Sequence, residues 1–127
     1  MIAVDTNIVV RFLVKDDPKQ STAAKAIFSG GAIWIAKTVL LETAWVVGKV
    51  YGYPEDAVRA ALLGVIGMKN VHIEGKPGLA VALGMSGVGI EDAIHLSSRP
   101  DGASFVTFDQ TFVKRAKRAG VRDIFSG

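Results

Sequence analysis

Short apolar runs alternate with segments of helical periodicity along the whole chain. We interpret the apolar runs as strands at residues 2–4, 32–35, 71–73, 104–107 and 121–124. Between them, apolar residues recur every three or four positions, which is typical of helices that bury one face. This order predicts an α/β fold, a three-layer α/β/α sandwich around a central, mainly parallel sheet. We expect residues 1–127 to form a single domain.

The local sequence also predicts where the helices begin and end. The predicted helices cover residues 6–14, 18–29, 38–51, 54–66, 77–85, 91–98 and 109–119. We expect Asp5 or Thr6 to cap the first helix, Asp17 the second and Thr38 the third. The run at residues 2–4 has no alternation, so we expect a first strand that is buried on both faces.

Composition excludes several classes of protein. The chain has no cysteine, which excludes disulfide frameworks, cysteine-based zinc sites and thiol catalysis. No apolar stretch reaches the roughly 18 residues of a membrane span, and the N-terminus has no basic region of the signal-peptide type. We therefore expect a cytoplasmic protein with no membrane partner.

Four acidic residues stand at helix starts or within an otherwise apolar helix. They are Asp5, Glu42, Asp92 and Asp109. Parallel α/β topology gathers the carboxyl ends of strands, and the helix starts that follow them, at one edge of the sheet. Glu42 lies among apolar neighbours without a Lys or Arg three or four residues away, so a buried Glu42 would need a partner or a cation.

A metal ion would explain four carboxylates in one place. Carboxylates that lie close together repel one another and raise each other's pKa. A hard divalent cation removes that repulsion, and oxygen ligands without cysteine favour Mg²⁺ or Mn²⁺ over Zn²⁺. Such a cation binds a phosphodiester oxygen and lowers the pKa of a water. The chain has no nucleotide-binding glycine loop and no readable Ser-His-Asp arrangement.

Each acid has a simpler interpretation when it is taken alone. Asp5 is a helix cap, Glu42 faces water at a helix edge, and Asp92 and Asp109 occupy first turns, where the helix dipole favours acids. We favour the ligand interpretation because all four occur together. Glu91 is interpreted as a solvated acid of the first turn, with contact to a second metal as the alternative.

The motifs around these acids resemble those of PIN-domain proteins. They are the stretches MIAVDTN at residues 1–7, LETAW at 41–45, EDAIHL at 91–96 and VTFD at 106–109. The chain length and the stretch VVRFLVKDDP at residues 9–18 most resemble VapC-type toxins of prokaryotic toxin–antitoxin pairs. The resemblance covers essentially the whole chain.

The resemblance implies a Mg²⁺- or Mn²⁺-dependent endoribonuclease that attacks RNA phosphodiesters with a metal-activated water and leaves 3′-hydroxyl and 5′-phosphate ends. The residues that match its catalytic and metal-binding positions are Asp5, Glu42, Asp92 and Asp109, and polar residues that match supporting positions are Asn7 and Thr107. It also implies a small antitoxin protein that inhibits the cleft. Nothing in residues 71–89 is diagnostic of a particular RNA.

Basic residues form a second set of candidates. The net charge is +3, and setting aside the four candidate acids leaves eight acidic against 15 basic residues, a balance of +7. A basic surface around an acidic cleft suits nucleic acid. We expect RNA contacts from Arg11, Lys15, Lys114 and Arg115, although each of them taken singly is better explained as a solvated side chain. His72 and His95 are expected to be structural.

The remaining expectations concern partners and rival functions. The mean hydropathy of +0.34 predicts apolar surface for a homodimer or an antitoxin, with Trp34 and Trp45 as core or dimer contacts. One rival is a PIN-like module that binds nucleic acid without cleaving it, and another is an RNA-processing nuclease outside any toxin–antitoxin pair. A phosphohydrolase with Asp5 as nucleophile fits poorly, since Asn7 stands where a second acid belongs. A phosphoaspartate receiver also fits poorly, since it would need paired acids just before its phosphoacceptor strand.

Overall fold

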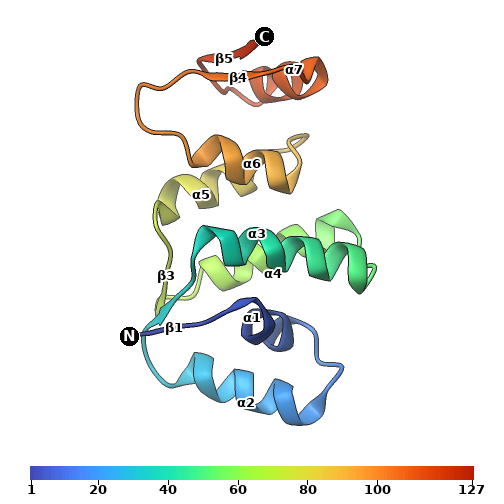
Figure 1. Cartoon of the computed structure of the whole chain (residues 1–127), viewed down its shortest axis with the longest axis vertical. Coiled ribbons are helices and arrows are strands. Elements are labelled where there is room, and N and C mark those ends of the chain that lie inside the picture. Colours follow the sequence, from blue (N-terminus) through green and yellow to red (C-terminus); the bar gives the residue numbers. More distant parts are fainter. The chain divides into compact units, whose positions relative to one another are not determined.

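The computed structural model describes all residues, 1–127, and divides into two compact units, residues 1–76 and 77–127. The first unit contains, in chain order, β1 (Ile2–Ala3), α1 (Thr6–Leu13), α2 (Pro18–Ser29), β2 (Ile33–Trp34), α3 (Lys37–Trp45), the π-helix η1 (Val46–Val50), α4 (Glu55–Ile66) and β3 (Val71–His72) (Figure 1). The second contains α5 (Lys76–Leu83), which begins at the junction, then α6 (Ile90–Ser97), β4 (Phe105–Thr107), α7 (Gln110–Arg118) and β5 (Ile124–Ser126).

The first unit is built on a three-stranded parallel sheet in the order β1-β2-β3. Ile33 of β2 is in register with Ile2 on one side and Val71 on the other, and both Ile33 and Val71 are fully buried. The parallel pairing confirms the predicted α/β class with crossover helices.

Helix packing supplies the rest of this core. α1 packs against both α2 and α3, and Figure 1 shows α1 and α2 side by side. The Phe12 and Phe28 rings stack between α1 and α2 with centroids 4.1 Å apart. Asp17 begins α2 by accepting a hydrogen bond from the Gln20 N–H, and Pro18 occupies the first helical position, as predicted. α1 is therefore held by its contacts with α2 and with α3.

The second unit holds a parallel pair of strands, β4 and β5, with Phe105 in register with Ile124. α7 packs against β5, and Phe105 meets Phe112 edge to face with ring centroids 5.6 Å apart. The buried residues of α7 are Phe112, Val113 and Ala116, which are spaced as one face of a helix. None of the helices in the chain is both long and apolar enough to span a membrane.

Three local predictions were wrong. Ile2 in β1 is 51% exposed, because β1 is an edge strand that pairs only with β2. Thr38 does not cap α3, since that helix already begins at Lys37 after Ala36, without a side-chain cap. The last strand lies at residues 124–126, because Asp123 adopts a positive φ of 55° and ends the preceding loop.

Candidate active site

Asp5 lies where the first strand gives way to α1. Its side chain caps that helix, with Oδ1 accepting a hydrogen bond from the Ile8 N–H at 3.2 Å. The next residue, Thr6, donates its hydroxyl hydrogen to Oε1 of Glu42, which lies in the middle of α3. Because α1 packs against α3, two carboxylates that are far apart in sequence come to one place.

A cavity of about 510 Å³ opens between these elements. The residues that line it are Asp5, Thr6, Asn7, Val10, Val39, Glu42, Val46, Val50 and Tyr51. The first unit thus brings together three of the predicted site residues, Asp5, Asn7 and Glu42. Glu42 is exposed to solvent rather than buried, so the cost of burial does not explain its position.

The polar side chains that line this cavity carry carboxylate, hydroxyl or amide groups. No Lys or Arg lines the cavity, and neither Asp5 nor Glu42 forms an ion pair. The protein hydrogen bonds engage one oxygen of each carboxylate and leave the other available. Two uncompensated carboxylates beside a hydroxyl and an amide carbonyl are the donor set of a hard divalent cation. These residues fit such an ion.

The other two candidate acids lie in the second unit, each at the start of a helix. Asp92 is half-buried in the first turn of α6, and the neighbouring Glu91 is exposed. Asp109 caps α7, with Oδ1 accepting a hydrogen bond from the Phe112 N–H at 2.9 Å. The Thr107 hydroxyl oxygen accepts from the Asp109 N–H at 3.1 Å, so Thr107 shapes the turn that presents Asp109.

No group of three or more His, Cys, Asp or Glu side chains is arranged to hold a metal ion. The first unit contributes the pair Asp5 and Glu42, whereas Asp92 and Asp109 belong to residues 77–127. A joint role for all four acids therefore stays a prediction from sequence.

Comparison with known protein families agrees with the motifs around these acids. The family model of the PIN domain matches residues 2–118. The chain belongs to the PIN domain family. PIN domains have an α/β fold and are generally metal-dependent nucleases, so the predicted fold class is confirmed. Searches of curated proteins and of solved structures gave no significant match.

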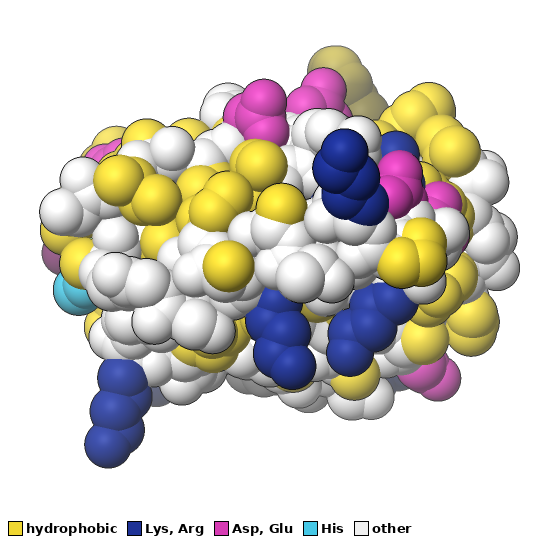
Figure 2. Space-filling model, turned by 90° about the horizontal axis from the view of Figure 1, so that it is seen from below, with side chains coloured by type: hydrophobic (Ala, Val, Ile, Leu, Met, Phe, Trp, Pro, Cys, Tyr) yellow, Lys and Arg dark blue, Asp and Glu magenta, His cyan; other side chains and the backbone are white.

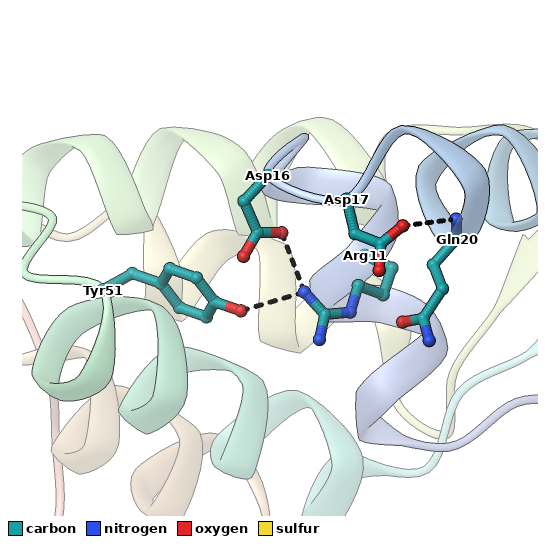
Figure 3. Close-up of polar contacts among 5 residues, drawn as sticks. All are labelled: Arg11, Asp16, Asp17, Gln20 and Tyr51. Carbon is teal, nitrogen blue, oxygen red and sulfur yellow. Dashed lines mark hydrogen bonds and ion pairs between the residues drawn. The ribbon is translucent and has the colours of Figure 1, made fainter.

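An unpredicted polar network adjoins the cavity of this PIN domain (Figure 3). Nη1 of Arg11, on α1, donates to Oδ1 of Asp16 at 2.8 Å and to the Tyr51 hydroxyl at 3.1 Å. The hydrogen bond to Asp16 raises the pKa of Arg11. Partial desolvation alone would raise the pKa of Asp16, but hydrogen bonds from Arg11 and Tyr51 outweigh it and leave that pKa below its ordinary value.

The network changes the interpretation of Arg11, whose side chain is only 23% exposed and is already paired with Asp16. Lys15, Lys114 and Arg115 are exposed. On the face of the PIN domain shown in Figure 2, basic side chains are scattered among apolar and acidic ones rather than gathered in one patch. RNA contacts by these residues stay a prediction.

Both histidines of the PIN domain are exposed, His72 in β3 and His95 at the end of α6, so neither belongs to the core. Trp45 is 50% exposed and Trp34 is half-buried. Sequence reasoning missed Tyr51 as a cavity residue. The only local signal was an aromatic residue at the end of the long apolar helix that contains Glu42.

Proposed function

We propose that this PIN domain is a Mg²⁺- or Mn²⁺-dependent endoribonuclease in which Asp5, Glu42, Asp92 and Asp109 are catalytic metal ligands. The observation that carries the proposal is the cavity that holds Asp5 and Glu42 together without a basic residue in its lining. Two carboxylates kept near each other without a counter-charge favour a cation at that place. For Asp92 and Asp109, support comes from their sequence motifs and from family membership.

The protein side chains have distinct tasks in this mechanism. When bound, the divalent cation would neutralise the charge of a phosphodiester and lower the pKa of a water. The Thr6 hydroxyl orients Glu42 through Oε1, and the Ile8 N–H orients Asp5 through Oδ1. Asn7 lines the same cavity and would position substrate or water. Thr107 holds the turn before Asp109.

The proposed reaction is hydrolysis with water as the nucleophile. A bond forms between the water oxygen and phosphorus, and the bond from phosphorus to the 3′ oxygen breaks. The water loses a proton and the 3′ oxygen gains one. The products carry a 3′-hydroxyl and a 5′-phosphate, because the bond to the 3′ oxygen is the one that breaks, and no cyclic phosphate forms because the 2′-hydroxyl takes no part. Cyclic 2′,3′-phosphate ends on the products would contradict this route.

The proposed function is tested by incubating the whole chain with mixed RNAs and Mn²⁺ or Mg²⁺. We expect cleavage that stops in excess EDTA and returns with added metal. Glu42→Gln keeps an acceptor for the Thr6 hydroxyl and removes the charge, so it should fold normally and lose cleavage. Glu74→Gln removes one negative charge from an exposed residue outside the cavity and is the matched control. Cleavage that continues in excess EDTA would contradict the proposal.

Membership of Asp92 and Asp109 in the site is tested by Asp92→Asn and Asp109→Asn. We expect each to abolish cleavage. Asp109→Asn should keep its fold, because Asn also accepts the capping hydrogen bond from the Phe112 N–H, and Asp92→Asn changes only the charge of a half-buried side chain of the same size. Glu91→Gln serves as the neighbouring control, since Glu91 is exposed beside the half-buried Asp92. If Glu91→Gln loses activity and Asp92→Asn keeps it, the ligand assignment moves to Glu91.

We also propose that the enzyme is the toxin of a toxin–antitoxin pair, a cytoplasmic homodimer inhibited by a small antitoxin protein. Support comes from the stretch at residues 9–18, which resembles VapC-type toxins, and from exposed apolar side chains such as Met1, Trp45 and Val50, at 76%, 50% and 63%. Induced expression of the wild type should arrest growth, whereas the Asp5→Asn variant should not. A short upstream reading frame whose product binds the chain would support the pairing.

Two rival functions would give different results in these assays. Cleavage of RNA without growth arrest, and without an upstream partner frame, would assign the chain to RNA processing. Binding of RNA without cleavage in either metal would assign it to a regulatory module. A single sedimenting species of 13.4 kDa at every protein concentration would contradict the homodimer.

A further inference from the structure

Two hydrogen bonds connect the first helix to the third along the cavity. Near the start of α1, Thr6 donates to Glu42, and near its end, Arg11 donates to the Tyr51 hydroxyl. α1 therefore contacts the continuous helix of α3 and η1 at two places along its length. Arg11 lies five positions after Thr6, which corresponds to about 8 Å of helix. The carboxylates and Tyr51 thus mark opposite ends of the same cavity.

The two ends differ in chemistry. Asp5, Asn7 and Glu42 supply the polar end, while Val46, Val50 and Tyr51 supply an apolar end that contains the cavity's one aromatic ring. Phosphate has no cationic partner at the apolar end, because no Lys or Arg lines the cavity. The volume of about 510 Å³ falls within the range of roughly 300–1,000 Å³ that is typical of small-molecule sites.

The π-helix brings Tyr51 to this cavity. In a regular α-helix, residue 51 would point about 140° away from residue 46, since each residue turns the helix by about 100°. In η1 the Tyr51 N–H instead donates to the Val46 carbonyl, five residues back, at 3.2 Å. This wider turn places Tyr51 over Val46, and both line the cavity together with Val50. π-turns of this kind are frequent at functional sites.

The polar network around Arg11 also fixes the position of the Tyr51 side chain. Its hydroxyl accepts from Arg11, whose guanidinium is in turn anchored by Asp16 at 2.8 Å (Figure 3). The ring thus loses little additional freedom when a ligand packs against it, which favours binding. The hydrogen bond engages the hydroxyl group, and the partly exposed side chain of Tyr51 lines the cavity.

We propose that the apolar end of this cavity is a nucleobase subsite in which a base of the RNA substrate stacks on Tyr51 between Val46 and Val50. The inference rests on the proposed ribonuclease function, since it places the base of a nucleotide whose phosphate lies at the carboxylate end. The two anchoring residues of α1, Thr6 and Arg11, are separated by about 8 Å of helix, which is of the order that a single nucleotide spans. Stacking on an aromatic side chain tolerates all bases, and the larger purine rings are expected to bind more tightly.

The direct test titrates neutral ribonucleosides, adenosine and uridine, into the whole chain and follows Tyr51 and the valine methyl groups by NMR. Nucleosides carry no phosphate, so their binding needs no metal and is not opposed by Asp5 and Glu42. We expect shifts at Tyr51, Val46 and Val50, with adenosine bound more tightly than uridine. Tyr51→Leu removes the ring and should weaken adenosine binding roughly 5- to 150-fold.

Further variants separate stacking from folding. Tyr51→Phe keeps the ring without the hydroxyl and should retain most of the binding. Tyr53→Leu removes a ring that is 44% exposed and does not line the cavity, so it should bind adenosine like the wild type. If Tyr51→Leu does not fold, Val50→Trp at a 63% exposed position should fill the subsite and block adenosine. Circular dichroism checks the folding of each variant.

The outcomes distinguish this inference from the proposed function. If the wild type binds adenosine at Tyr51 but cuts no RNA, the subsite stands and the ribonuclease proposal fails. If RNA is cut but folded Tyr51→Leu binds adenosine as tightly as the wild type, the subsite fails alone. With both intact, Tyr51→Leu should raise KM far more than it lowers kcat. Shifts at Tyr51 that depend on protein concentration and not on adenosine would assign the cavity to a second copy and overturn the inference.

Discussion

Asp5 serves both as the N-cap of α1 and as a proposed metal ligand, and two substitutions separate these roles. Asparagine can accept the same hydrogen bond from the Ile8 N–H, and the two residues are nearly equal as helix caps. Alanine accepts nothing. We therefore expect Asp5→Asn to keep the free energy of unfolding and lose RNA cleavage, whereas Asp5→Ala should lose part of both.

The size of each effect follows from the local geometry. Loss of an N-cap costs about 0.5–2 kcal/mol, and the 3.2 Å separation between Asp5 Oδ1 and the Ile8 nitrogen is at the long end for a hydrogen bond. Asp5→Ala should thus lower the free energy of unfolding by about 0.5–1 kcal/mol, or about 2–5 °C in Tm for a chain of this size. Cleavage should fall by at least about 100-fold in both variants, since even residues behind a metal ligand are worth 10- to 100-fold.

Asp17 provides a matched control for the capping role. It caps α2 by accepting from the Gln20 N–H at 3.1 Å, and it does not line the cavity. Asp17→Ala should lower Tm as much as Asp5→Ala does and leave cleavage unchanged. Tm is measured by circular dichroism, and cleavage by the rate of RNA hydrolysis in Mn²⁺. Wild-type cleavage by folded Asp5→Asn would refute the ligand role and leave Asp5 as a cap alone.

Three further predictions address the polar network, the core and the basic helix. The pKa of Asp16 is lowered in the folded protein, so its pairing with Arg11 stabilises the fold at pH values above the ordinary pKa of 3.8. This stabilisation is lost as the pH falls through the lower folded-state pKa. In Tm measurements over a series of acidic pH values, Asp16→Asn should remove this part of the fall in Tm. Phe28→Ala should cost about 3–5 kcal/mol in urea unfolding, because Phe28 is 1% exposed and stacks on Phe12; a cost under about 1 kcal/mol would contradict the packing. Lys114→Gln and Arg115→Gln should each reduce the salt dependence of RNA binding by about one unit of slope, measured with Asp5→Asn to prevent cleavage; an unchanged slope would exclude the phosphate contacts.

Helix starts that depend on a single side chain were predictable from the sequence. Asp5, Asp17 and Asp109 each accept a hydrogen bond from an N–H three residues ahead, an interaction that needs no distant partner. Thr38 has the same cap chemistry, yet α3 begins one residue earlier, because the path of the chain after β2 decides where that helix starts. Local chemistry thus predicts a cap only where the path of the backbone permits it.

Burial was harder to predict than periodicity. The apolar run at residues 2–4 predicted a strand buried on both faces, but a run of this kind does not reveal how many neighbours the strand has. β1 pairs with β2 alone, and its residues are exposed. Glu42 is exposed although Val39 and Val46 lie on its side of the helix, because that side opens onto the cavity that all three line.

The sequence by itself determined the α/β class, the parallel strands, most helix boundaries and membership of the PIN domain family. These features depend on local periodicity and on short motifs. Only the tertiary structure decided that Glu42 meets Thr6, that Arg11 is paired rather than free, and that Tyr51 faces the cavity with Asp5. The first two are contacts between residues 36 and 40 positions apart, and the third depends on a helix turn widened to five residues. All three arise from packing between helices, which no local pattern encodes.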